Sequence, residues 1–256
     1  MKKLISLFFV ASLFLIGFTA CEQTEKPGGI PGMGETPGEL EIDKPFVAPE
    51  GVTIDVAGLD EIRLDDAASG SANLKSAQWS WGNTFSCGGS KDKNDFVFWI
   101  NVNISMSNSN NSEMCVTIPQ GTVFETSDPN GQNGILLTDM KICVKAHEVV
   151  DCNLMLMCLN YLRPGSKKDI FYKMLGTTNS KLLQELISYL KGKKIGIEFY
   201  TNIVPSSKLK STSAEDLETY KEIADRIQNT IWDLTNHGKN ISQDDIDFFN
   251  SIPDIE

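Results

Sequence analysis

Apolar and polar positions alternate along most of the chain up to about residue 162. Asn101, Asn103 and Ser105 share one face of an extended segment. The opposite face carries Phe96, Phe98, Ile100, Val102, Ile104 and Met106. A period of two is typical of a strand with one buried face. Residues 140–146 alternate in the same way, and residues 149–162 are apolar on both faces from Leu154 on, which predicts a central strand.

Turn-rich segments separate these strands. Pro119-Gln120-Gly121 divides two short alternating runs, residues 127–134 read SDPNGQNG, and Pro164-Gly165 ends the central strand. Short strands at this spacing favour an antiparallel sheet folded into a sandwich or barrel. We expect this β-rich domain to cover residues 52–175.

The period changes to that of a helix after residue 175. One apolar face is formed by Leu182, Leu183, Leu186, Ile187 and Leu190. Gly192 follows as a C-cap, Ser213 with Asp216 resembles a capping box for a longer helix, and Ser242 with Asp245 opens a last short one. Residues 194–201 read as one more strand. The predicted class is α+β: an antiparallel β-sandwich or barrel-like domain, followed over residues 176–256 by a mainly helical part that packs on it.

The N-terminal residues predict export. Lys2 and Lys3 precede a long apolar run, so residues 1–20 are expected to be a signal peptide. Small residues before Cys21 resemble a bacterial lipobox, which implies acylation of Cys21 by fatty acid and attachment to a membrane. The alternative is ordinary signal cleavage near a bystander cysteine.

Residues 21–51 are expected to be the acylated cysteine and a flexible tether. Five prolines and six glycines lie between Glu22 and Gly51, so little apolar surface offsets the entropy of ordering. A coil of this length reaches on the order of 30 Å. Glu22 and Glu25 resemble the surface-export signals of Bacteroidota lipoproteins. We therefore expect an exported, lipid-anchored protein of the outer membrane, and the orientation of the domain, outward or toward the periplasm, stays open.

Charge and composition exclude several function classes. The formal net charge is −11, which disfavours nucleic-acid binding. His147 and His237 are the only histidines, and neither zinc-ligand spacing nor a phosphate-binding loop is present. We expect no cofactor and no metal.

Five cysteines follow Cys21, namely Cys87, Cys115, Cys143, Cys152 and Cys158. An exported protein can form disulfides, and with five cysteines at least one thiol stays unpaired. Which cysteines pair stays open, and the alternative is that several of them are reduced. On one unbroken strand, Cys152 and Cys158 lie roughly 20 Å apart and do not bridge each other. Met155 and Met157 are expected on the opposite face, which argues against a copper site.

Two segments together resemble the Cys–Gln thioester domains of bacterial surface adhesins. The matching residues are Cys158, Gln228, Ile231 and Trp232, the last three in a motif similar to Thr-Gln-x-Ala-Ile-Trp. This chain departs at Met157, where the family has an aromatic residue, and at Ile227 and Thr230. The resemblance implies that the thiol attacks the glutamine carbonyl, ammonia leaves, and a partner amine later takes the acyl group. The alternative is a semi-exposed glutamine on a helix edge.

These features favour a surface-tethered lipoprotein that acts in binding or adhesion, with an extracellular protein or glycan as partner, and not an enzyme. One alternative is a structural component of a surface assembly without covalent chemistry. The other is an enzyme on glycans or peptides, for which the adjacent Asp244 and Asp245 argue little because they face differently on a helix.

Lipidation gives the first testable prediction. Metabolic labelling with a fatty-acid analogue should mark the wild-type protein and miss the Cys21→Ala variant, because Cys21 is the acceptor thiol. Equal labelling of both proteins would reject the anchor.

Overall fold

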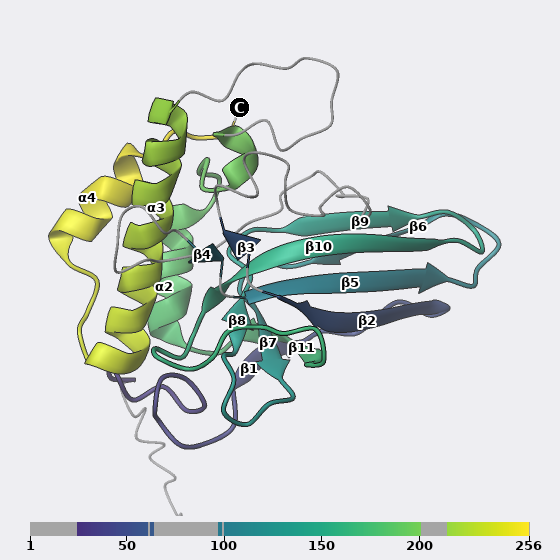
Figure 1. The fold of residues 1–256 in the computed structure, drawn as a ribbon, viewed down its shortest axis with the longest axis horizontal. Helices are drawn as coiled ribbons and strands as arrows, with labels where there is room; N and C mark the ends of the chain where they lie inside the picture. The colour runs from purple at the N-terminus through teal and green to yellow at the C-terminus, as the bar shows by residue number, and fades with distance from the viewer. Residues whose placement is uncertain (1–24, 61, 64–96, 99, 201–213, 256) are drawn as a thin grey trace, which may run out of the picture.

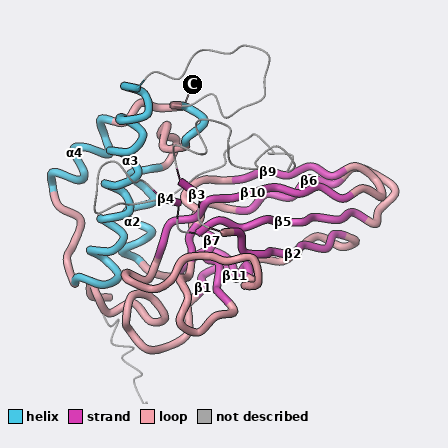
Figure 2. Tube along the Cα trace, in the orientation of Figure 1, coloured by secondary structure: helices cyan, strands magenta, loops and turns pink. Residues whose placement is uncertain are grey.

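The computed structural model describes residues 25–60, 62–63, 97–98, 100–200 and 214–255. Within them an antiparallel β-structure is followed by helices gathered at one end of it (Figures 1 and 2), so the predicted α+β class is confirmed. The strands are β1 (Ile42–Pro45), β2 (Val52–Leu59), β3 (Ile62–Arg63), β4 (Val97–Phe98), β5 (Ile100–Asn108), β6 (Met114–Ile118), β7 (Thr122–Thr126), β8 (Gly134–Ile135), β9 (Met140–Val144), β10 (Val149–Cys158) and β11 (Tyr172–Thr178). The helices are α2 (Lys181–Leu190), the 3₁₀ turn η2 (Ile197–Phe199), α3 (Ala214–Trp232), the π-helical turn η3 (Asp233–His237) and α4 (Gln243–Ser251).

The main sheet has seven strands in the order β1-β11-β7-β8-β10-β5-β2, and all neighbours are antiparallel. The sheet curls until β2 meets the residues before β11. There Ala57 bridges Phe171, and the Gly58 N–H donates to the Ile170 carbonyl over 2.7 Å. A Cβ at Gly58 would collide with the Lys167 carbonyl, so glycine permits this close approach. The result is a barrel-like sheet joined on one side by a single bridge.

A two-stranded ribbon, β6 with β9, packs on the main sheet. Val116, Ile142 and Val144 on its inner side belong to one apolar cluster with Ile104 and Leu154 of the main sheet. Cys115 and Cys143 are directly paired on its outer face and form a disulfide with Cα atoms 4.0 Å apart. The expected disulfide is therefore present, and the alternation of apolar residues accounts for the buried side of the ribbon.

The helices bury a second apolar cluster against the other face of the sheet near β8 and the end of β10. Met157 and Leu159 contribute from the strand side, and Leu186, Ile227 and Ile231 from the helices. Because side chains alternate along a strand, Met157 faces the helices whereas Cys152 and Cys158 face the interior of the β-structure. The predicted opposition of Met157 to the two cysteines is confirmed.

The predicted tether is wrong for residues 25–51, which pack on the domain. Ile30, Met33 and Leu40 lie in the helix-side core, and β1 pairs with β11. Burial of each such side chain contributes about 2 kcal/mol, which offsets part of the entropy cost of ordering this segment. Its backbone hydrogen bonds to the domain, such as those of β1 with β11, also stabilise it. We call residues 25–40 the strap.

Other boundaries also shift. β11 runs through the expected division between residues 175 and 176, so the β-structure ends at Thr178. The strand expected at 194–201 is wrong over the described residues 194–200, where Ile197–Phe199 forms a 3₁₀ turn. The capping box of Ser242 and Asp245 is confirmed, and Gly192 adopts the positive φ of 75° expected after a helix end. Cys21, Cys87 and Ser213 lie outside the described residues.

The ribbon disulfide gives the second prediction. A Cys115→Ala/Cys143→Ala variant should lose about 3 to 4 kcal/mol of unfolding free energy, because the bridge closes a loop with a sequence separation of 28. Urea denaturation measures this loss, with Thr117→Ala on the same exposed face as control. A loss equal to that of the control would show that the ribbon is held by packing alone.

Candidate functional site at the sheet–helix junction

The structure brings Cys158 and Gln228 into direct contact. The Cys158 N–H donates to Oε1 of Gln228 over 2.9 Å, and Nε2 of Gln228 donates to the Cys158 carbonyl over 2.9 Å. Both residues are fully buried, with 0% of their surface exposed. One side-chain amide therefore satisfies both peptide groups of a residue 70 positions away in the sequence. The alternative of a semi-exposed glutamine is wrong.

The N–H and C=O of Cys158 can bond the Gln228 side chain because the pairing of β10 with β5 ends before Cys158. The last residue of β10 that pairs with β5 is Leu156, opposite Ile100. Hydrogen-bonding direction alternates along a strand, and the N–H of Leu159 faces β8, where it donates to the Asn133 carbonyl. The N–H and C=O of Cys158 therefore point away from β8, and Gln228 pairs with them.

The packing of α3 places Gln228 at the end of β10. Ile227 and Ile231 lie in the helix-side core, while Trp232 reaches the cluster inside the β-structure that also contains Cys158. The helix then widens into the π-helical turn η3. Such turns are frequent at functional sites. The end of α3 thus contacts both cores at the point where β10 ends.

Cys158 lies in the apolar cluster inside the β-structure, near Tyr172. Cys158 and Cys152 are the described cysteines that form no disulfide, and both are buried. Tyr172 lies in the same cluster, where burial is the main cause that raises the pKa of its hydroxyl, and the nearby Cys158 raises that pKa further. The ring of Tyr161 packs edge-on against Trp232, with centroids 4.8 Å apart.

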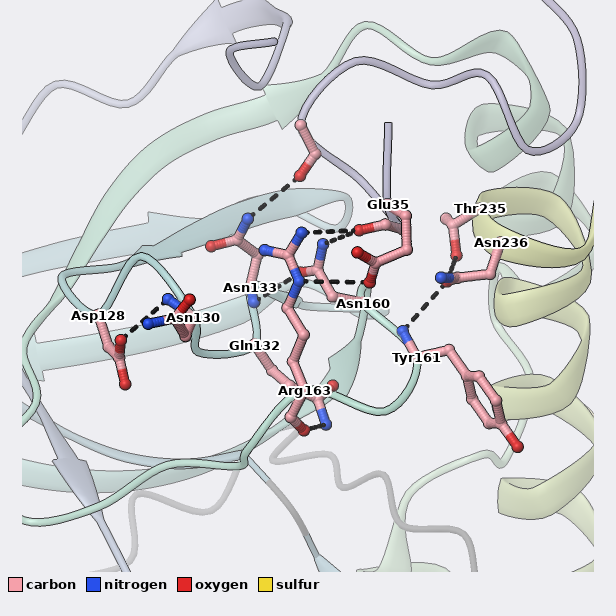
Figure 3. A network of polar contacts seen from close by, with 12 residues as sticks. Glu35, Asp128, Asn130, Gln132, Asn133, Asn160, Tyr161, Arg163, Thr235 and Asn236 are labelled. Atoms are coloured by element: carbon pink, nitrogen blue, oxygen red, sulfur yellow. Dashed lines mark hydrogen bonds and ion pairs between the residues drawn. The ribbon is translucent and has the colours of Figure 1, made fainter. Parts of the chain in front are cut away.

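The strap locks the turn that follows Cys158. The N–H of Gly34 donates to the Leu159 carbonyl over 3.0 Å, and the Gly34 carbonyl accepts from Asn160 Nδ2 and Arg163 Nη2. Arg163 also pairs with Glu35, at 3.6 Å (Figure 3). Gly34 has a φ of 59°, and a Cβ there would collide with the carbonyl of Thr235. Glycine is thus required where the strap crosses η3.

Asn133 links this turn to a pocket. Its N–H donates to Asn160 Oδ1 over 2.9 Å, and its side chain bonds the Thr126 N–H and the Gly32 carbonyl (Figure 3). A pocket of about 410 Å³ opens between the strap and the end of β7, with Asn133 and Arg163 in its wall. The pocket is thus formed by the same residues that hold the end of β10.

Sequence patterns did not identify Asn133, Asn160, Arg163 or Glu35. They lie in turns and loops without periodicity, and the contacts that join them to one another and to the strap link residues more than 25 positions apart. A cluster of three or more residues suited to hold a metal ion is absent from the described part of the chain. Among the described residues no helix is long and apolar enough to cross a membrane.

Comparisons with known proteins give no relative. No protein-family model matches the chain, and no curated protein or solved structure matches it.

The buried amide pair gives the third prediction. In a Cys158→Ala background, where no thioester can form, Gln228→Ala should lower the unfolding free energy by about 3 kcal/mol, because it leaves a buried N–H and C=O without partners. Asn229→Ala, at an exposed position one residue along the helix, should change it by less than about 0.5 kcal/mol. Chemical denaturation measures both. Equal effects would show that the two hydrogen bonds do not hold the junction.

Proposed function

We propose that this chain is a lipid-anchored surface protein that binds a partner covalently through a thioester between Cys158 and Gln228. The observation that carries the proposal is the pair of 2.9 Å hydrogen bonds between the Gln228 amide and the Cys158 main chain. They hold the amide carbon beside the residue whose thiol would attack it. Such fixed proximity replaces a search in solution and lowers the entropy cost of bringing the two groups together.

The bond-forming step balances without an added oxidant or reductant. The Cys158 sulfur attacks the amide carbon of Gln228, the carbon–nitrogen bond breaks, and the thiol proton leaves with the amide nitrogen as ammonia. In the second step a partner amine attacks the same carbon. A new amide forms, and the displaced sulfur regains a proton.

The main-chain N–H of Cys158 has a second role in this proposal. It already donates to Oε1 of Gln228, the atom that gains negative charge when the carbonyl is attacked. A donor fixed in advance on that oxygen stabilises the tetrahedral intermediate of acyl transfer. Because Cys158 and Gln228 are fully buried, water is also kept from the thioester until a partner arrives.

Attachment through Cys21 would place this domain close to the membrane. Glu25 accepts a hydrogen bond from the Leu182 N–H at the start of α2, over 3.1 Å. Four residue steps separate Cys21 from Glu25, a span of at most about 14 Å. The proposed location is the outer membrane, facing outward, and the partner is an extracellular protein.

A structural role is the second candidate. The amide of Gln228 has both of its polar atoms bonded, which is also what a simple clamp between strand and helix requires. In that case the chain would be a structural component of a surface assembly and would form no covalent bond.

Intact mass separates the two candidates and is the fourth prediction. With the thioester, the domain should weigh one ammonia less than its sequence with disulfides counted, and methylamine should add as an adduct on Gln228. Cys158→Ala should abolish both effects, whereas Cys152→Ala, the other buried cysteine on that face, should keep them. A wild-type domain of full mass whose Cys158 is alkylated after unfolding would reject the thioester and leave the clamp.

A further inference from the structure

The strap bonds both segments that carry the Cys158–Gln228 pair. The N–H of Gly34 donates to the carbonyl of Leu159, the residue after Cys158, over 3.0 Å. The N–H of Gly28 donates to the carbonyl of Leu234, in the π-helical turn directly after α3, over 2.6 Å. The strap therefore crosses the junction from the end of the strand that holds the cysteine to the end of the helix that holds the glutamine.

Apolar side chains of the strap cover the same junction. Ile30 and Met33 are 3% and 1% exposed, and both belong to the helix-side cluster. That cluster also contains both chain neighbours of Cys158 and the residue that precedes Gln228. If the strap leaves, this apolar surface meets water, and the contact that holds the end of β10 against α3 weakens.

The strap is held more loosely than the elements that it joins. Residues 25–40 contain no helix or strand, and separate hydrogen bonds, not a ladder, tie them to the turns beside them. The pocket of about 410 Å³ lies between residues 35–38 of the strap and the end of β7, so the packing between these two segments is incomplete. Such a segment can open locally at a lower cost in free energy than unfolding of the whole domain.

We propose that the strap is a gate over the Cys158–Gln228 pair. While the strap is closed, both residues are fully buried. When it detaches, the turn after Cys158 and the π-helical turn η3 lose the bonds that they share through it, and the Gln228 carbonyl carbon becomes accessible to a partner amine. Only the reaction rests on the proposed function: the amine nitrogen bonds to this carbon, the carbon–sulfur bond breaks, and one amine proton goes to the sulfur. The opening itself needs no thioester.

Hydrogen exchange of the full-length Cys158→Ala protein tests the gate without the thioester. The reporters are the main-chain N–H groups of position 158, which Gln228 binds, of Gly34 and, as reference, of Leu154, where β10 is paired with β5. Positions 34 and 158 should have protection factors within about threefold of each other and at least about a hundredfold below that of Leu154, because they open together and without the β-structure. Protection of position 158 that matches Leu154, or that lies far below that of Gly34, would overturn the gate.

Two glycines offer a matched pair of variants. Gly34 has a φ of 59°, and a Cβ there would collide with the Thr235 carbonyl. Gly192, after α2, has a φ of 75°, and a Cβ there would meet no heavy atom within 4 Å. Both alanine variants therefore carry backbone strain of the same kind, but only Gly34→Ala pushes the strap away from η3.

Exchange at position 158 separates the two variants. In the Cys158→Ala background, Gly34→Ala should speed this exchange by about tenfold or more, and Gly192→Ala by less than about twofold, because only the first variant shifts the strap toward its open state. Equal acceleration by both variants would show that position 158 opens only when the whole domain unfolds, which would overturn the gate. A Gly34→Ala variant without acceleration would overturn it as well.

The rate of adduct formation links the gate to the proposed chemistry. With Cys158 present, Gly34→Ala should form the methylamine adduct on Gln228 about tenfold faster than the wild type, and Gly192→Ala should stay within about twofold of it, because the amine reacts with the open state. Equal rates of all three proteins would overturn the gate. If the wild type shows no loss of ammonia, the proposed function fails, and hydrogen exchange of the Cys158→Ala protein still decides whether the strap opens the junction.

Discussion

The junction between sheet and helices depends on the two hydrogen bonds between the Gln228 amide and the main chain of Cys158. Without them, the last residue of β10 would have a buried N–H and C=O with no partner, at a cost of about 1 to 3 kcal/mol for each. A hydrophobic contact could hold α3 against the sheet, but it is not directional. The amide fixes the position of α3 along β10, and with it the position of Trp232 inside the β-structure.

The contact between Gln228 and Cys158 lies where the two apolar clusters meet. Met157 and Leu159 face the helices, while Cys158 between them faces the interior of the β-structure. The strap then bonds the turn after β10 through Gly34, and the N–H of Gly28 donates to the Leu234 carbonyl in η3, directly after α3. Strand end, helix end and strap form one connected polar network in an otherwise apolar region. Such a network, fully bonded, specifies a single arrangement of its parts.

Periodicity predicted β5, β6, β7, β9 and β10, the apolar helix faces and the α+β class, because each depends on residues close together in the sequence. It missed β1, β2, β8 and β11, whose pairing depends on distant segments. It predicted that the helices follow the sheet, but not how they dock. The strap was predicted to be a flexible tether because it is rich in proline and glycine. Its three buried apolar residues, Ile30, Met33 and Leu40, gave no signal, since their burial depends on surfaces made by distant segments. Cys158 and Gln228 could be paired only through a resemblance. Asn133 and Arg163 had no local signal, since their partners come from turns and from the strap.

The side-chain NH₂ group of Gln228 reports most directly on the central claim. In the proposed thioester its nitrogen has left as ammonia, while in the clamp it remains bonded to the Cys158 carbonyl. Two-dimensional NMR of protein labelled with ¹⁵N at glutamine side chains, compared with Gln228→Ala for assignment, observes this group. The account predicts that the Gln228 pair of signals is missing from the wild type and appears, slow to exchange, in Cys158→Ala. A Gln228 pair present at full intensity in the wild type would contradict it.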